Sequence, residues 1–142
     1  MGISARNVFK GGITAIKEGP INAEVEITTP GGDTIVAMLT ETSVKSLRRA
    51  LGQEAVAVVK APWVTLMSGA PQYRFSARNQ LQGKVSAISK GGVNSQVALA
   101  LPGGSTVYAV VTNDAVAELQ LSAGSPAVAL FKAGHVLVGV PV

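Results

Sequence analysis

Apolar and polar residues alternate along much of the chain in short runs, a pattern that predicts β-strands with one buried face. The clearest run covers residues 21–28, where Ile, Ala, Val and Ile alternate with polar side chains. The turn-forming residues Pro30-Gly31-Gly32-Asp33 follow, and residues 34–39 predict the returning strand of a hairpin. Before this hairpin, residues 6–17 predict a longer strand that bends at Gly11-Gly12.

A single short helix is predicted after the hairpin. The string Thr40-Glu41-Thr42-Ser43 supplies residue types that cap a helix N-terminus. In a helix that starts there, Val44, Leu47 and Leu51 share one face, and Gly52 marks the end. Two further strands are then predicted over residues 54–60 and 63–67.

The whole pattern occurs twice. Ser4-Ala5-Arg6-Asn7 returns as Ser76-Ala77-Arg78-Asn79, and Pro30-Gly31-Gly32 returns as Pro102-Gly103-Gly104, both at an offset of 72 residues. Roughly 25 of about 61 aligned positions are identical, far more than chance produces. Five strands with one helix between the third and the fourth is the element order of an OB-type barrel. The chain is therefore predicted to be all-β, with two OB-type five-stranded barrels that each carry one short helix.

The join between the two copies is predicted at Ser68-Gly69-Ala70-Pro71-Gln72, where small residues and a proline interrupt the alternation. The first module then covers residues 1–68 and the second covers residues 73–142. A unit of about 65 residues buries only about 60% of its unfolded surface. We therefore expect extensive contact between the modules and between chains.

Composition narrows the function. The chain has 47% hydrophobic but only 4% aromatic residues, no cysteine and one histidine, His135. No disulfide and no cation site are expected from this set. No run is apolar enough for a membrane span or a leader, so we expect a cytoplasmic location. The formal net charge of +4 favours an anionic partner, either a small anion or a nucleic acid.

The repeated strings carry hydroxyl and cationic groups that suit a small oxyanion. In extended chain Ser4 and Arg6 point to one side, as Ser76 and Arg78 do, so a hydroxyl and a guanidinium can converge on one anion. The alternative is an ordinary surface strand that carries an arginine. The recurrence of the string favours the functional interpretation.

Two further kinds of position recur, each with an ordinary structural alternative. Thr40 and Ser43, with Thr112 in the second copy, stand at predicted helix starts, where free N–H groups favour an anion and where N-capping is an equal explanation. The strings Lys60-Ala61 and Lys132-Ala133 end apolar strands, where the alternative is a solvated edge charge.

A possible second anion site is predicted where glycine-containing segments could direct backbone N–H groups at an anion. It takes Ile21-Asn22 in the first copy and Val93-Asn94 in the second. A plain β-turn is the alternative there. All these groups suit a tetrahedral dianion, which must be held by donors because carboxylates repel it.

Several strings resemble those of the molybdate-binding Mop domain, and their tandem arrangement resembles a two-domain molbindin. The strings are Ser4-Ala5-Arg6-Asn7, Asn22-Ala23-Glu24-Val25, Pro30-Gly31-Gly32 and the run from Val58 to Val64. The resemblance implies a cytoplasmic homotrimer of OB-type barrels that stores molybdate or tungstate between modules or subunits, without a cofactor.

The resemblance also implies which residues bind the anion. One class of site takes the Ser and Arg of the repeated string, the hydroxyls at the helix start and the strand-end Lys-Ala pair; here these are Ser4, Arg6, Thr40, Ser43, Lys60, Ala61, Ser76, Arg78, Thr112, Lys132 and Ala133. The second module departs from the pattern at Ala115, which replaces Ser43, and at Gly134-His135, which replaces Pro62-Trp63.

The main alternative is an OB-fold protein that binds single-stranded nucleic acid on stacked aromatic side chains. The six aromatic residues are scattered, and most lie in apolar runs that favour core packing: Phe9, Trp63, Tyr73, Phe75, Tyr108 and Phe131. A molybdate-responsive regulator is a further alternative, but the 142 residues show no helix-turn-helix pattern.

Catalysis is not expected. The chain has no nucleophile-elbow string, no phosphate-loop string and no pair of carboxylates on one face. His135 lies in an apolar segment and is interpreted as a packing residue. Glu24, Glu26 and Glu54 are interpreted as solvated strand residues.

Overall fold

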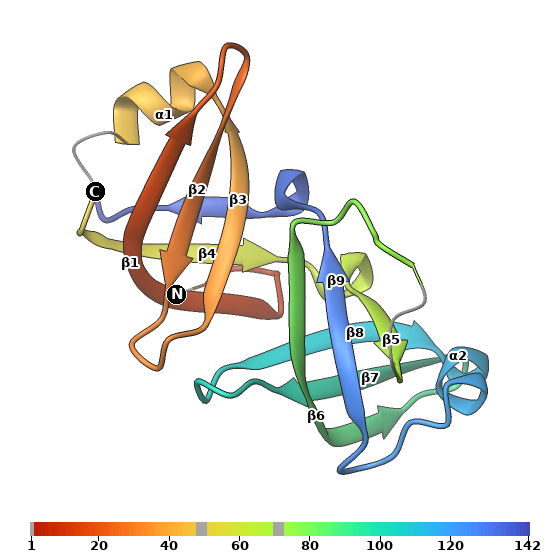
Figure 1. Ribbon diagram of the computed structural model, residues 1–142. Helices are drawn as coiled ribbons and strands as arrows, with labels where there is room; N and C mark the ends of the chain where they lie inside the picture. The colour runs from red at the N-terminus through yellow and green to blue at the C-terminus, as the bar shows by residue number, and fades with distance from the viewer. Residues whose placement is uncertain (1, 48–50, 70–72) are drawn as a thin grey trace.

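The computed structural model describes residues 2–47, 51–69 and 73–142, and only the backbone of residues 46 and 47 (Figure 1). Each half of the described chain runs through the same order of strands and short helices. The first half holds β1 (Asn7–Glu18), β2 (Asn22–Thr28), β3 (Thr34–Thr40), α1 (Glu41–Leu47), β4 (Glu54–Val59), the 3-10 helix η2 (Ala61–Trp63) and β5 (Thr65–Ser68). The second half holds β6 (Asn79–Lys90), β7 (Asn94–Ala100), β8 (Thr106–Thr112), α2 (Asn113–Glu118), β9 (Pro126–Phe131), the 3-10 helix η3 (Ala133–His135) and β10 (Leu137–Gly139).

The predicted fold class is confirmed, since two five-stranded antiparallel sheets form an OB-like fold with short helices. The strand orders are β10-β4-β1-β2-β3 and β5-β9-β6-β7-β8. Each sheet thus takes four strands from one sequence repeat and its fifth strand from the other, as Figure 1 shows for β10 beside β4 and β5 beside β9. Of the predicted linker, residues 70–72 lie outside the described residues.

The long first strand bends where the sequence predicted. Through residues 7–12 β1 pairs with β4, and from Gly12 onward it pairs with β2, with an irregularity between Ile13 and Ala15. Gly11 lies against the Thr28 carbonyl, so closely that a Cβ at that position would overlap it. Glycine is required here because the bend brings two backbones together.

The helix prediction was too long. Within the described residues α1 covers Glu41–Leu47, and Leu51, which was predicted to lie on its face, lies instead in an isolated bridge to Ile13 with 58% of its surface exposed. Ile13 lies opposite Ile27 of β2, and its own N–H and C=O bond to the chain that returns toward β4: Ile13 N–H donates to Gln53 O at 3.1 Å and Gly52 N–H donates to Ile13 O at 2.8 Å. Of the predicted helix face, Val44 is fully buried, and the Leu47 side chain and residues 48–50 lie outside the described residues.

Two buried asparagines join the halves. Asn79, in β6, accepts from Val36 N–H and donates to Val36 O, both at 2.8 Å. Asn7, in β1, makes the same two hydrogen bonds with Tyr108: it accepts from Tyr108 N–H at 2.7 Å and donates to Tyr108 O at 2.8 Å. Val36 and Tyr108 belong to β3 and β8, the edge strands of their sheets, so each side-chain amide takes the place of a missing neighbouring strand.

The hairpin tips add a third polar contact between the halves. Asp33 is buried, and its Oδ1 accepts from Gly103 N–H at 2.9 Å while its Oδ2 accepts from Ser105 N–H at 3.1 Å. Gly31 lies so close to the Gly103 carbonyl that a side chain would not fit. The two repeats are therefore held in one fixed relation.

Changing Asn79 to Ala tests this junction. The variant leaves the buried N–H and C=O of Val36 unpaired, and each unpaired group costs about 1–3 kcal/mol, so we expect a loss of roughly 2–6 kcal/mol in the free energy of unfolding, measured by urea denaturation. The matched control is Gln82→Ala on the exposed face of the same strand, with an expected change within about 0.5 kcal/mol. Equal stability of the two variants would show that the amide does not hold the edge strand.

Candidate functional site

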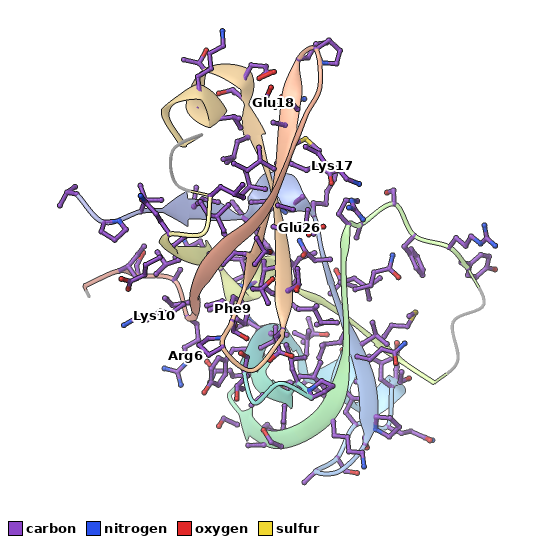
Figure 2. All side chains as sticks on the ribbon, turned by 60° about the vertical axis from the view of Figure 1, so that its left-hand side comes forward. Arg6, Phe9, Lys10, Lys17, Glu18 and Glu26 are labelled. Carbon is purple, nitrogen blue, oxygen red and sulfur yellow. The ribbon has the colours of Figure 1, made fainter. Side chains whose placement is uncertain are left out.

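The repeated Ser-Ala-Arg-Asn strings enter β1 and β6, and the buried asparagine fixes each string against the other half of the molecule. The serines and arginines that precede the asparagines are exposed. Each arginine therefore lies over a strand of the other repeat. Arg6 lies with its guanidinium carbon 4.5 Å from the centroid of the Tyr108 ring, a cation–π contact. Figure 2 shows Arg6 and Lys10 at the periphery, near the start of β1.

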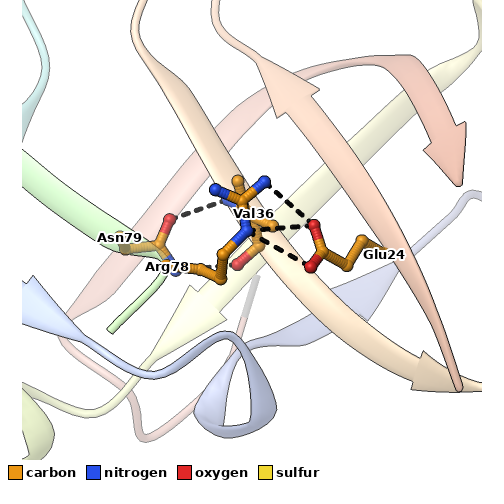
Figure 3. Close-up of polar contacts among 4 residues, drawn as sticks. All are labelled: Glu24, Val36, Arg78 and Asn79. Carbon is orange, nitrogen blue, oxygen red and sulfur yellow. Dashed lines mark hydrogen bonds and ion pairs between the residues drawn. The ribbon is translucent and has the colours of Figure 1, made fainter. Parts of the chain in front are cut away.

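Arg78 has a different partner, the carboxylate of Glu24 in β2 (Figure 3). Its Nε donates to both carboxylate oxygens, at 3.2 and 3.1 Å, and its Nη2 donates to Oε2 at 2.9 Å. The hydrogen bond from Arg78 holds the pKa of Glu24 below its ordinary value, and the same bond raises the pKa of Arg78. The prediction that Glu24 is a solvated strand residue is thus only partly correct, because Glu24 is half-buried and its carboxylate is paired with Arg78.

The hydroxyl residues at the helix starts act as caps. Thr40 Oγ1 accepts from Ser43 N–H at 3.2 Å and donates to the Ser43 hydroxyl at 3.0 Å. Thr112 Oγ1 accepts from Ala115 N–H at 3.0 Å. Helix capping, which the sequence offered as the alternative to anion binding, therefore explains both threonines. Both residues are also exposed.

The two lysines occupy equivalent places. Lys60 and Lys132 directly precede η2 and η3, both are exposed, and neither side chain caps its helix. Ala61 and Ala133, the first residues of those helices, are buried. Helix η2 lies against β8 and helix η3 lies against β3, so each lysine is brought to the opposite repeat.

Four of the predicted donors line two separate cavities, whereas the linings of these cavities do not include Ser4, Arg6, Lys60, Arg78 or Thr112. Ser76 and Lys132 line one cavity of about 460 Å³ together with Trp63 and His135. Thr40 and Ser43 line another of about 450 Å³ together with Gly134. The full predicted donor set does not converge within one chain. Neither lining contains a carboxylate among the described residues.

The segments predicted as a second anion site are tight turns between paired strands. Gly19 N–H donates to Asn22 O at 3.0 Å, and Gly91 N–H donates to Asn94 O at 2.8 Å. Ile21 and Val93 are exposed at the tips of these turns. The geometry matches the β-turn alternative, and an anion site there stays a prediction.

The aromatic side chains are less buried than the sequence predicted. Phe9 and Phe131 are core residues, but Trp63 and Phe75 are 49% and 48% exposed, and Tyr73 is also exposed. Burial was predicted for most of these residues. Trp63 lies between β4 and β5, where the chain leaves one sheet for the other, and Tyr73 and Phe75 lie in the segment between β5 and β6, outside the strands. Trp63 also stacks on His135, with ring centroids 4.4 Å apart, which supports a packing role for that histidine.

Sequence reasoning missed the residues whose roles depend on the opposite repeat. Asn7 and Asn79 were part of the recurring string, and that recurrence was their only signal. Glu24 and Tyr108 carried no local signal, because each acts on an arginine from a distant part of the chain. No helix of the described chain is both long and apolar enough to cross a membrane.

Comparison with known proteins agrees with this arrangement. The family model of the TOBE domain matches residues 3–66 and 76–138. The molybdenum transport protein ModE of Herbaspirillum seropedicae is 43% identical over 140 residues, which cover 99% of this chain and 52% of that protein. The molybdenum-pterin-binding protein MopA of Rhodobacter capsulatus is 38% identical over 141 residues, or 99% of this chain and 53% of that protein. The chain thus spans about half the length of these curated relatives.

A solved structure gives the same result over a full chain. The cytoplasmic molybdate-binding protein ModG, solved with molybdate bound, superposes with a TM-score of 0.91 at 55% sequence identity, and the match covers 99% of this chain and 100% of that chain. The predicted resemblance to molbindins is confirmed by both comparisons. The chain belongs to the TOBE-domain family and is a tandem Mop-domain protein of the molbindin type.

Proposed function

We propose that this protein binds molybdate, or the similar tungstate, and stores it in the cytoplasm as the intact oxyanion, without catalysis and without a cofactor. The observation that carries the proposal is the full-length likeness to a protein solved with molybdate bound. The chemistry of the described surface supports it, because hydroxyl and ammonium groups line cavities that contain no carboxylate. A dianion needs such donors.

The division of donors between two cavities leads to a second part of the proposal. Ser76 with Lys132, and Thr40 with Ser43, each form only part of a binding shell. A second copy of the chain completes each shell, in the homotrimer that the likeness to molbindins implies. Exposed apolar residues beside these cavities, among them Trp63, Phe75 and Leu137, supply surface for such contacts.

Single-stranded nucleic acid is the alternative ligand, and the exposed Trp63 and Phe75 are the observation in its favour. The cavity that they line is apolar and holds one lysine, Lys132, with no basic groove among its lining residues. Nucleic-acid binding of this kind needs a positively charged track beside the aromatic residues. The oxyanion is therefore the better fit.

Isothermal titration calorimetry with sodium molybdate tests the function, with sulfate and a single-stranded oligonucleotide as parallel titrants. We expect tight molybdate binding that Arg6→Ala and Lys60→Ala each weaken by about tenfold or more, since a charge-assisted hydrogen bond contributes about 1.5–3 kcal/mol. Lys10→Ala, which removes an exposed lysine of β1 outside the site, is the matched control. Heat with the oligonucleotide and none with molybdate would establish the alternative.

Light scattering on the purified protein tests the assembly. We expect a mass about three times the chain mass of 14.4 kDa. Leu137→Lys places a charge beside Thr40 and Ser43 and should lower both the mass and the affinity for molybdate, because an interface that must bury the charge is destabilised. A monomer that binds molybdate as tightly as the wild-type protein would contradict sites shared between copies.

A further inference from the structure

The two arginines of the repeated string face opposite electrostatic surroundings. Two hydrogen-bond donors of the Arg78 guanidinium, Nε and Nη2, are engaged by the Glu24 carboxylate, as Figure 3 shows. Glu26, two residues along the same strand, adds a second negative charge near Arg78. Arg6 lies over the neutral Tyr108 ring, and within the described ranges it has no carboxylate partner.

The difference arises at three equivalent positions of the repeat, one of which is Tyr108, in the place of Val36. At the offset of the repeat, Gln96 stands where the first copy has Glu24, and Ala98 stands where it has Glu26. β2 and β7 hold the same place in their sheets, each between the long strand and the edge strand, with the same register to the edge strand. The fold therefore presents two arginines in equivalent places, of which Arg78 lies beside two carboxylates and Arg6 lies over an aromatic ring.

We propose that Glu24 sets unequal affinities at the two copies of the oxyanion site, so that the copy with Arg6 fills first and the copy with Arg78 binds more weakly because the anion must displace Glu24. The inference rests on the proposed function and specifies how its two sites differ. Glu24 is a specificity-determining residue in this account, since it competes with the ligand and does not bind it.

Competition follows from the geometry of the guanidinium. A tetrahedral oxyanion prefers the paired, parallel N–H donors of an arginine, and the Glu24 carboxylate already occupies the Nε edge of Arg78. An anion that binds elsewhere on this guanidinium would still lie close to a like charge. Lys17, opposite Glu24 in the β1–β2 register, offsets part of that charge but leaves the hydrogen bonds in place.

The competitor is charged at neutral pH. The pKa of Glu24 is lowered, first by the hydrogen bond from Arg78, so the carboxylate stays ionised throughout the neutral range. Glu24→Gln removes the charge at nearly constant shape and gives this position the residue type that the second copy has at Gln96, while Glu26 stays in place. Gln96→Glu makes the reverse change at the equivalent position of the second copy.

Calorimetric titration of the full chain with sodium molybdate distinguishes the two sites. For the wild-type protein we expect two classes of site that differ in their affinity for molybdate. For Glu24→Gln we expect the affinity of the weaker class to rise by about tenfold or more, because one nearby like charge is removed. Gln96→Glu should weaken the tighter class. Glu54→Gln, which removes an exposed carboxylate of β4, controls for the change in net charge and should leave both classes as they are.

Arginine variants assign the classes. In the wild-type background Arg6→Ala should weaken binding at the tighter class and Arg78→Ala at the weaker one, whereas in the Glu24→Gln background the two losses of affinity should be closer to each other. Identical isotherms for wild type, Glu24→Gln and Gln96→Glu, with molybdate bound in all three, would overturn this inference and leave the proposed function intact. Absence of molybdate binding by the wild-type protein would overturn the proposed function itself, and far-UV circular dichroism confirms that each variant is folded.

Discussion

The structure depends on how the edge strands β3 and β8 satisfy their backbone groups. An open sheet edge leaves N–H and C=O groups that must find water, another strand or a substitute. Here the substitute is the primary amide of Asn79 on β3 and of Asn7 on β8, which reproduces both hydrogen bonds of a peptide group. Each half of the molecule therefore completes an edge of the other.

The exchange of β5 and β10 makes this dependence mutual. The fifth strand of each sheet comes from the other repeat, so neither repeat has its complete sheet alone. A unit of this size buries too small a share of its unfolded surface to be more than marginally stable by itself. Exchange enlarges the shared surface, and the buried Asp33, which accepts from the Gly103 and Ser105 N–H groups, fixes the angle between the halves. The frame that carries Arg6 and Arg78 is held together by these contacts between the halves.

A symmetric frame carries chemistry that differs between its halves. The asparagines place Arg6 and Arg78 in equivalent positions, yet Tyr108 faces one and Glu24 faces the other. The exposed side chains around the arginines contribute little to the core and can change without cost to the fold. Duplication thus supplies two copies of one geometry, and a few surface substitutions are enough to make their electrostatics unequal.

The sequence by itself determined the strands, the bend at Gly11-Gly12, the threonine caps and the duplication, because alternation, backbone sterics and capping act between residues close along the chain. It also indicated the family through short strings. The tertiary structure alone decided which sheet β5 and β10 join, that Leu51 pairs with Ile13 outside the helix, which aromatic side chains stay exposed, and that Arg78 meets Glu24. These outcomes depend on contacts between residues far apart in sequence, such as the 54 positions between Arg78 and Glu24, and no local pattern encodes such a contact.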